Sequence, residues 1–271
     1  MSMSFQRLKR LRLPRRQLLR RQPLRRQLLP KPLPTEVTVH ISFSELKNWN
    51  TCAFYHKLVH IDKLAGFKGN EYTAFGTAIH TICEKMLLRE AVSPQLFIDE
   101  LRNNITSLDD DIEINKKLVV DMATQGKNIM PEVEDAVEDY FGEDYEVVST
   151  EEKLFEPIEG YVDYNFKGFI DAVIKTKDGK VHIVDWKSCS WGWNAQRRSE
   201  PMTTYQLTLY KHFYAIKHGI DPSMIETHFA LLKRTAKKNR VEIFRVTSGP
   251  RKTENALGLL DKALKNIMKR N

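Results

Sequence analysis

The sequence has little cysteine and no long apolar run. Its 271 residues contain three cysteines, Cys52, Cys83 and Cys189, and no Cys-x-x-Cys pair. Thiols this few and this scattered argue against a disulfide framework and a zinc finger, and they indicate a reducing compartment. No segment approaches the ~18 consecutive apolar residues of a membrane-spanning helix. We therefore expect a cytoplasmic chain without a membrane partner.

Acidic residues are absent from the first 35 positions, which hold eleven Lys or Arg. The rest of the chain carries 32 basic and 35 acidic side chains, so the formal charge of +8 comes from this arm. An Arg-Arg-Gln repeat recurs every five residues over 15–29, and four prolines over 23–34 disfavour a helix there. We expect 1–35 to be a disordered arm, solvated or touching nucleic acid. A mitochondrial presequence is the alternative, and with it a mitochondrial location.

Residues 36–271 read as one domain with three parts, which are a helical part at about 42–141, a core at about 145–250 and a helix at about 251–269. The Ser42-Phe43-Ser44-Glu45 capping pattern predicts a short first helix. Apolar residues at helical spacing predict a second helix over 73–89. Alternating segments predict strands, and a further helix is expected over 201–218. The predicted strands cover 145–156, 161–176, 180–187, 225–234 and 240–247. We expect a mixed α/β or α+β fold with a helical insertion before the sheet.

Two carboxylates and a lysine meet on the predicted hairpin around Asp178-Gly179. Across this antiparallel pair Asp171 lies near Asp185, and Asp185 and Lys187 are two residues apart on one face. In isolation such a group is more often a surface salt bridge of little energetic value. Here the preceding apolar run, 181–184, makes the strand central. A Mg²⁺ or Mn²⁺ ion would relieve the repulsion between the two carboxylates, and Lys187 could assist a metal-activated water.

Four ordered motifs resemble the PD-(D/E)XK nuclease superfamily, in particular its RecB-like exonuclease branch and exonucleases of tailed bacteriophages. They are Ser42–Leu46 with Cys52–Tyr55, Gly76–His80, Gly168–Asp171 with Asp185–Ser188, and Gln206–Tyr210. The resemblance covers roughly 40–247. It implies a restriction-endonuclease-like core, with a central mixed sheet flanked by helices.

The resemblance also implies roles for individual residues. The metal ligands would be His80, Asp171, Asp185 and the backbone carbonyl of Trp186. Lys187 would be the catalytic lysine. Gln206 and Tyr210, one helical turn apart, would hold a phosphate or orient that lysine. Without the resemblance, His80 reads as an ordinary half-buried histidine, and Gln206 and Tyr210 read as capping or core residues.

A further carboxylate is expected at the start of the sheet. Glu151 and Glu152 both qualify and should point to opposite faces. The pattern of the family that the chain resembles has an apolar residue three positions after the acid, here Leu154, which slightly favours Glu151. Some members of the branch hold an iron–sulfur cluster through four cysteines. No cysteine follows Cys189, so we expect no cluster. The chain also lacks a Walker motif, and any helicase motor would be another chain.

Two basic loops are candidates for DNA contacts, although either could be a plain solvated loop. One follows Lys187 directly and the other separates the last two predicted strands. The candidate contacts are Trp191, Trp193, Arg197, Arg198, Lys233, Arg234, Lys237 and Lys238. Aromatic rings stack on unpaired bases and cations bind phosphates.

The sequence therefore predicts a Mg²⁺- or Mn²⁺-dependent DNA exonuclease acting on linear or single-stranded ends, with a helicase or recombination protein as a possible partner. If the chain is phage-encoded, its place is the host cytoplasm. The alternatives are a structure-specific or restriction-like endonuclease on the same core and a non-catalytic nucleic-acid-binding protein.

Overall fold

The computed structural model describes residues 39–64 and 66–269. The chain divides into two units, 1–37 and 38–271, and the described residues belong to the second. The basic arm expected over 1–35 lies outside the described residues. Among the helices that the structure describes, none has the length and apolar character to cross a membrane.

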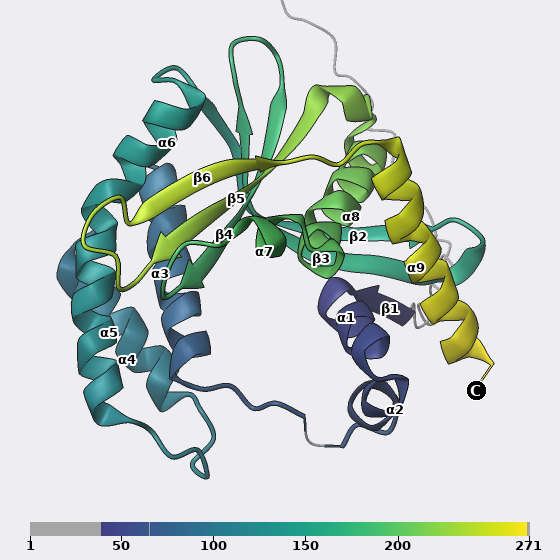
Figure 1. The fold of residues 1–271 in the computed structure, drawn as a ribbon, viewed down its shortest axis with the longest axis horizontal. Coiled ribbons are helices and arrows are strands. Elements are labelled where there is room, and N and C mark those ends of the chain that lie inside the picture. Colours follow the sequence, from purple (N-terminus) through teal and green to yellow (C-terminus); the bar gives the residue numbers. More distant parts are fainter. Residues whose placement is uncertain (1–38, 65, 270–271) are drawn as a thin grey trace, which may run out of the picture. The chain divides into compact units, whose positions relative to one another are not determined.

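Six strands form one mixed sheet (Figure 1). The strands are β1 (Val39–Ser42), β2 (Glu146–Ile158), β3 (Tyr161–Lys175), β4 (Val181–Cys189), β5 (Ile225–Lys233) and β6 (Val241–Val246). Their order is β1-β3-β4-β5-β6, and β2 also pairs with β3. The pairs β1–β3 and β4–β5 are parallel, and the others are antiparallel. The short β1 was not expected from the sequence.

Strand β3 has an unusual distribution of partners. Strand β2 pairs along nearly all of one edge of β3. The other edge is shared, because β1 pairs with residues 164–167 and β4 pairs with residues 172–175. In this register, none of the strands that the structure describes pairs with residues 168–171 on that edge. The sheet therefore opens a notch between β1 and β4.

Helices cover both faces of the sheet (Figure 1). The α-helices are α1 (Phe43–Thr51), α2 (Ala53–His56), α3 (Glu71–Leu87), α4 (Pro94–Thr106), α5 (Lys116–Ile129), α6 (Val133–Phe141), α7 (Ala195–Ser199), α8 (Pro201–His218) and α9 (Pro250–Met268). Single turns at Lys57–Ile61, Met130–Glu132 and Pro222–Met224 join them. One hydrophobic core joins α1, α8 and α9 to the sheet, and a second joins α3–α6 to the opposite face.

Helix ends follow the signals in the sequence. The Ser42 hydroxyl accepts a hydrogen bond from the Glu45 N–H at 3.2 Å and starts α1. Gly219 adopts φ +63° after α8, a left-handed conformation that suits glycine. The predicted turn at Asp178-Gly179 joins β3 to β4, and Gly179 has φ +81°.

Strand β4 is buried on both faces, as its apolar run predicts. Val181 and Ile183 enter the core with α8, whereas Val184 and Trp186 enter the core with α3–α6. The mixed sheet with helices on both sides confirms the expected fold class.

Candidate active site

The notch in the sheet is where the two predicted aspartates lie. The β3–β4 ladder ends at the pair Ala172–Val184, one residue short of Asp171 and Asp185. Past this last pair, the Trp186 N–H donates to a side chain of β3 and not to its backbone. The acceptor is Asp171 Oδ2, at 2.7 Å. The Trp186 ring is buried in the core with α3–α6, so only its backbone faces the notch. Because β3 and β4 stop pairing before Asp171, there is room beside this side chain.

Asp185 is buried, with 2 % of its surface exposed, and is contacted from two elements. Lys187 Nζ lies 2.5 Å from Asp185 Oδ2. From α8, the Gln206 amide donates to Asp185 Oδ1 at 2.9 Å and lies 3.2 Å from the Tyr210 hydroxyl. The two oxygens of Asp185 thus face different groups, the Lys187 ammonium at Oδ2 and the Gln206 amide at Oδ1.

Helix α3 brings its own side chains to the notch. His80 Nδ1 lies 3.6 Å from Asp171 Oδ2. Gly76, one turn earlier, lies near β4, since a Cβ there would be 3.5 Å from the Ser188 hydroxyl. Glu84, one turn after His80, accepts a hydrogen bond from the Thr150 hydroxyl at 2.9 Å. Glu84 was not among the residues expected from the sequence, although its four-residue spacing from His80 places both on one helix face.

The two candidate glutamates on β2 have different surroundings. Burial, together with the charges of nearby Glu84 and Asp185, raises the pKa of Glu151. Its backbone has φ +47°, a left-handed conformation that is strained for a residue with a side chain. Glu152 lies elsewhere, where it binds Lys217 at 2.8 Å and His218 at 2.6 Å. Glu151 is therefore the glutamate placed with the aspartates.

The notch brings two buried carboxylates close together, and both are poorly solvated. Burial and the neighbouring Asp185 raise the pKa of Asp171 well above its ordinary value. Burial raises the pKa of Asp185 against the opposing effect of Lys187. Burial and Lys187 lower the pKa of His80 to about 4, so its ring is a neutral ligand at pH 7.

These groups fit a divalent cation. The donor set is carboxylate oxygen with one imidazole, and a cation there would offset the mutual repulsion of Asp171 and Asp185. Asp171, Asp185 and His80 would hold the ion, and Glu151 lies near enough to Asp185 for their charges to interact. Such oxygen donors suit Mg²⁺ and Mn²⁺.

A family comparison matches most of the chain. Residues 40–268 match the sequence model of the PD-(D/E)XK nuclease superfamily. The chain belongs to this superfamily. Its mixed sheet flanked by helices is the restriction-endonuclease-like fold, as the sequence predicts. The nucleases of this superfamily use divalent metals, in agreement with the donor set in the notch.

Two solved structures are similar to this PD-(D/E)XK nuclease chain. The crystal structure of SSO0001 has a TM-score of 0.38 and 12 % identity, over 86 % of this chain and 78 % of that one. The structure of LHK-Exo in complex with dAMP has a TM-score of 0.26 and 13 % identity, over 73 % and 94 % of the two chains. A search of curated proteins finds no significant match.

The basic loops of the nuclease domain divide into exposed and interior residues. Trp191 is 67 % exposed, and Arg197, Lys237 and Lys238 are also exposed. Arg197 stacks over the face of Trp193, 4.6 Å from the ring centre. These four exposed side chains remain candidates for DNA contact.

Four other candidates for DNA contact have partners within the protein. Trp193 is buried against Phe229 and Phe244. Arg198 and Lys233 both bind Glu242, and the buried Arg234 donates to the Ser190 hydroxyl at 2.8 Å. Trp193 and Arg234 are buried, whereas Arg198 and Lys233 are partly exposed, and a role of these four side chains in DNA contact stays a prediction. A count of cations in the sequence cannot reveal a partner such as Glu242 on a later strand.

Proposed function

We propose that this PD-(D/E)XK protein is a metal-dependent DNA exonuclease of the RecB-like branch, similar to exonucleases of tailed phages. The observation that carries the proposal is the meeting of Asp171, Asp185, Lys187 and His80 at the notch between β1 and β4. A protein that only binds nucleic acid has no need for a lysine beside a buried carboxylate pair.

Each residue at the notch has a chemical task. Asp171, Asp185 and His80 would hold a Mg²⁺ or Mn²⁺ ion, with the Trp186 carbonyl as a further ligand. The bound ion would polarise the phosphodiester and lower the pKa of an attacking water. Lys187 places a positive charge where negative charge develops on the phosphate. Gln206, backed by Tyr210, fixes the orientation of Asp185. Glu151 lies on the same side and could accept a proton.

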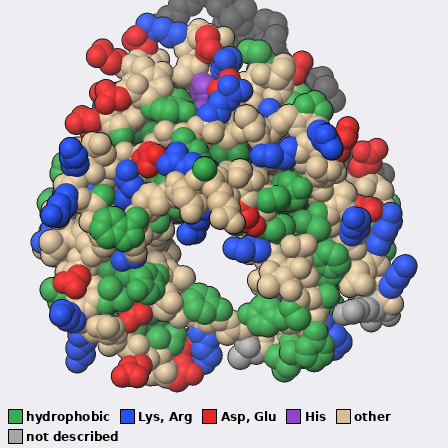
Figure 2. Space-filling model, viewed as in Figure 1, with side chains coloured by type: hydrophobic (Ala, Val, Ile, Leu, Met, Phe, Trp, Pro, Cys, Tyr) green, Lys and Arg blue, Asp and Glu red, His purple; other side chains and the backbone are tan. Residues whose placement is uncertain are grey.

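The substrate we propose is DNA with a free end, linear or single-stranded. Trp191 offers a stacking surface and Arg197, Lys237 and Lys238 offer phosphate contacts. Figure 2 shows a hollow in this face, between α1 and α3, with Lys and Arg side chains on its rim. We further propose a nuclease domain over 36–271 preceded by the basic arm, a host-cytoplasmic location and a helicase or recombination partner.

One assay tests the reaction. The protein is incubated with Mg²⁺ or Mn²⁺ and end-labelled linear, nicked or circular DNA. We expect degradation of linear DNA only. Cleavage of closed circles would instead show an endonuclease on the same core. Retention of DNA on a filter without any cleavage would show a binding protein and contradict the proposal.

A matched pair of lysine variants tests the mechanism. Lys187→Ala should lower the cleavage rate by at least about 100-fold, because a charge that stabilises the transition state is lost. DNA binding and the unfolding temperature should change little. Lys217→Ala is the control, since Lys217 pairs with Glu152 away from the notch. Near wild-type cleavage by Lys187→Ala would refute the assigned role.

A further inference from the structure

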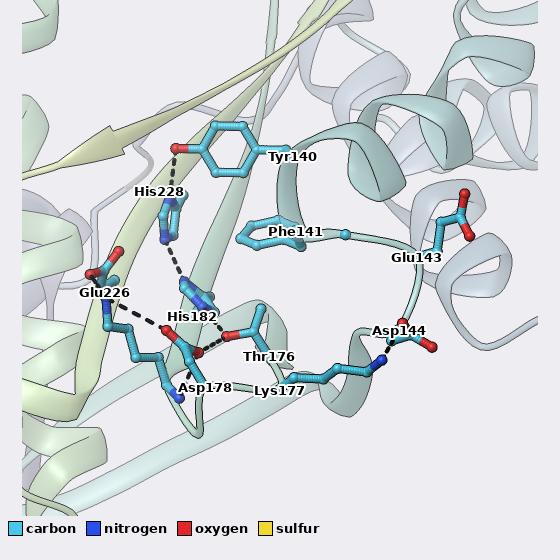
Figure 3. Close-up of a pocket in the computed structure, with 12 residues that line it drawn as sticks. Tyr140, Phe141, Glu143, Asp144, Thr176, Lys177, Asp178, His182, Glu226 and His228 are labelled. Carbon is cyan, nitrogen blue, oxygen red and sulfur yellow. Dashed lines mark hydrogen bonds and ion pairs between the residues drawn. The ribbon is translucent and has the colours of Figure 1, made fainter.

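A second group of metal-binding side chains lies outside the notch, where β4 and β5 begin (Figure 3). It consists of His182, Glu226 and His228, whose ligand atoms all lie within 4.8 Å of one another. Parallel pairing of β4 with β5 places His182 beside Glu226 and Val184 beside His228. His182 precedes Asp185 by three residues, about 10 Å along the strand, and points to the opposite face.

The two imidazoles face each other. His182 Nδ1 and His228 Nε2 are 3.0 Å apart. Two nitrogens bound to one zinc ion at about 2.0–2.1 Å are separated by about 3.3 Å at the tetrahedral angle. The observed separation is that of a direct hydrogen bond, and the rings would need to move apart by only about 0.3 Å to share an ion.

The outer nitrogens have the partners that ligating imidazoles need. His182 Nε2 lies 3.0 Å from the Thr176 hydroxyl, and His228 Nδ1 lies 3.3 Å from the Tyr140 hydroxyl. Metal-bound histidines almost always donate their second N–H to an oxygen, which fixes the ring and its tautomer. With protons on both outer nitrogens, both inner lone pairs point at the same spot.

Glu226 supplies the third donor and the negative charge. Its carboxylate binds Lys180 at 3.0 Å and Arg245 at 3.4 Å. Burial alone would raise its pKa, but the two cations outweigh burial and lower it, so the carboxylate is ionised. Both imidazoles are shielded, with His182 7 % and His228 2 % exposed, and Phe141 packs against both rings. The three side chains are therefore shielded from solvent on one side and line a cavity on the other (Figure 3).

We propose that His182, His228 and Glu226 bind a borderline transition-metal ion such as Zn²⁺, with water in the fourth position. Imidazole selects such ions over Mg²⁺, so this site and the notch take different metals. The ion ties together the starts of β4 and β5, and through Tyr140 and Thr176 it holds the end of α6 and the β3–β4 turn. Its role is to stabilise the domain and not to cleave DNA.

The test uses the full chain carrying His80→Ala and Asp185→Ala, so that the notch cannot compete for zinc. Metal-free protein is dialysed against Zn²⁺ in excess Mg²⁺, and bound zinc is measured. We expect one equivalent, and a rise in unfolding temperature of about 5 °C at saturating zinc. Adding His228→Gln or His182→Gln should remove both effects. His212→Gln, on α8 and outside the cluster, is the matched control.

The outcomes distinguish a metal site from a row of side chains that are only hydrogen-bonded to one another. Zinc binding that survives both glutamine variants, or no zinc binding by the background protein, overturns the proposal. If a glutamine variant does not fold, Glu226→Gln replaces it. Co²⁺ in place of Zn²⁺ gives a further readout, because the visible bands of a four-coordinate ion should appear only with the cluster intact. DNA cleavage by the protein with an intact notch tests the proposed nuclease function, and zinc binding by the background protein tests the second site.

Discussion

Asp171 carries an electrostatic cost that a metal ion would remove. Burial and Asp185 raise its pKa above 3.8, so above that pH the folded protein retains a proton that the unfolded chain has lost. The stability of the metal-free protein should therefore fall as pH rises from about 4 through the folded pKa. Asp171→Asn keeps an oxygen for the Trp186 N–H and removes the charge.

We predict that metal-free Asp171→Asn is more stable than wild type at pH 7, by about 1 kcal/mol, and less sensitive to pH. It should cleave no DNA and gain less stability from Mg²⁺. Thermal unfolding between pH 4 and 8, with and without Mg²⁺, measures all of this. Asp163→Asn, exposed on the same strand, is the control. A less stable Asp171→Asn would show that its charge is already compensated.

Glu151 and Glu152 allow a matched pair of substitutions on one strand. Glu151→Gln removes a charge near Asp185 and Glu84, so cleavage should fall about 10-fold or more while stability is kept. Glu152→Gln loses its pairs with Lys217 and His218 and should cost about 1 kcal/mol while cleavage is kept. Cleavage rates and urea unfolding distinguish the two patterns. Reversed patterns would assign the accessory carboxylate to Glu152.

At the scale of elements, the packing of α5 on α4 depends on one glycine. A Cβ at Gly126 would lie 2.0 Å from Phe97 Cζ. Although alanine favours helices, Gly126→Ala should destabilise the domain by about 2 kcal/mol. Gly258 in α9 faces open space, so Gly258→Ala should stabilise by up to about 1 kcal/mol. Unfolding temperatures measured side by side check both, and equal shifts of the same sign would contradict the packing argument.

Elements with local signals could be predicted from the sequence. The capping pattern at Ser42, the apolar face of α3, the turn at Asp178-Gly179 and Gly219 after α8 all depend on neighbours in the chain. The convergence of Asp171 with Asp185 followed from the same hairpin.

Features that depend on distant segments could not be predicted. The parallel pairing of β4 with β5 places His182 beside Glu226, 44 residues away, and no local pattern indicates it. Alternation shows which residues share a face but not what covers that face, so the burial of Trp193 and Arg234 was missed. Glu84 is a different case, since its spacing from His80 was visible.

At the scale of the whole molecule, positive charge is concentrated in residues 1–35, outside the described residues. Without them the chain has a formal charge of −3. Deleting 1–35 should leave turnover at saturating DNA unchanged. It should weaken DNA binding and flatten its salt dependence, because each lost phosphate contact removes about 0.7–0.9 from the slope of log affinity against log salt.

Binding at two or more salt concentrations, with and without the arm, measures the effect. Equal affinities and equal salt slopes would rule out a DNA-contacting arm. Cleavage of the arm in a eukaryotic cell would then favour the targeting alternative.

Strand β4 contributes side chains alternately to both hydrophobic cores, so neither core can open without exposing it. The helical half and the α8–α9 half therefore melt as one cooperative unit, although each has its own interior. Amide protons along 181–186 should exchange with solvent only through global unfolding, which makes this strand the slowest-exchanging segment of the domain. Asp185 lies in this strand and Lys187 directly follows its slowest part, so their backbone positions would persist through any local fluctuation that admits or releases DNA.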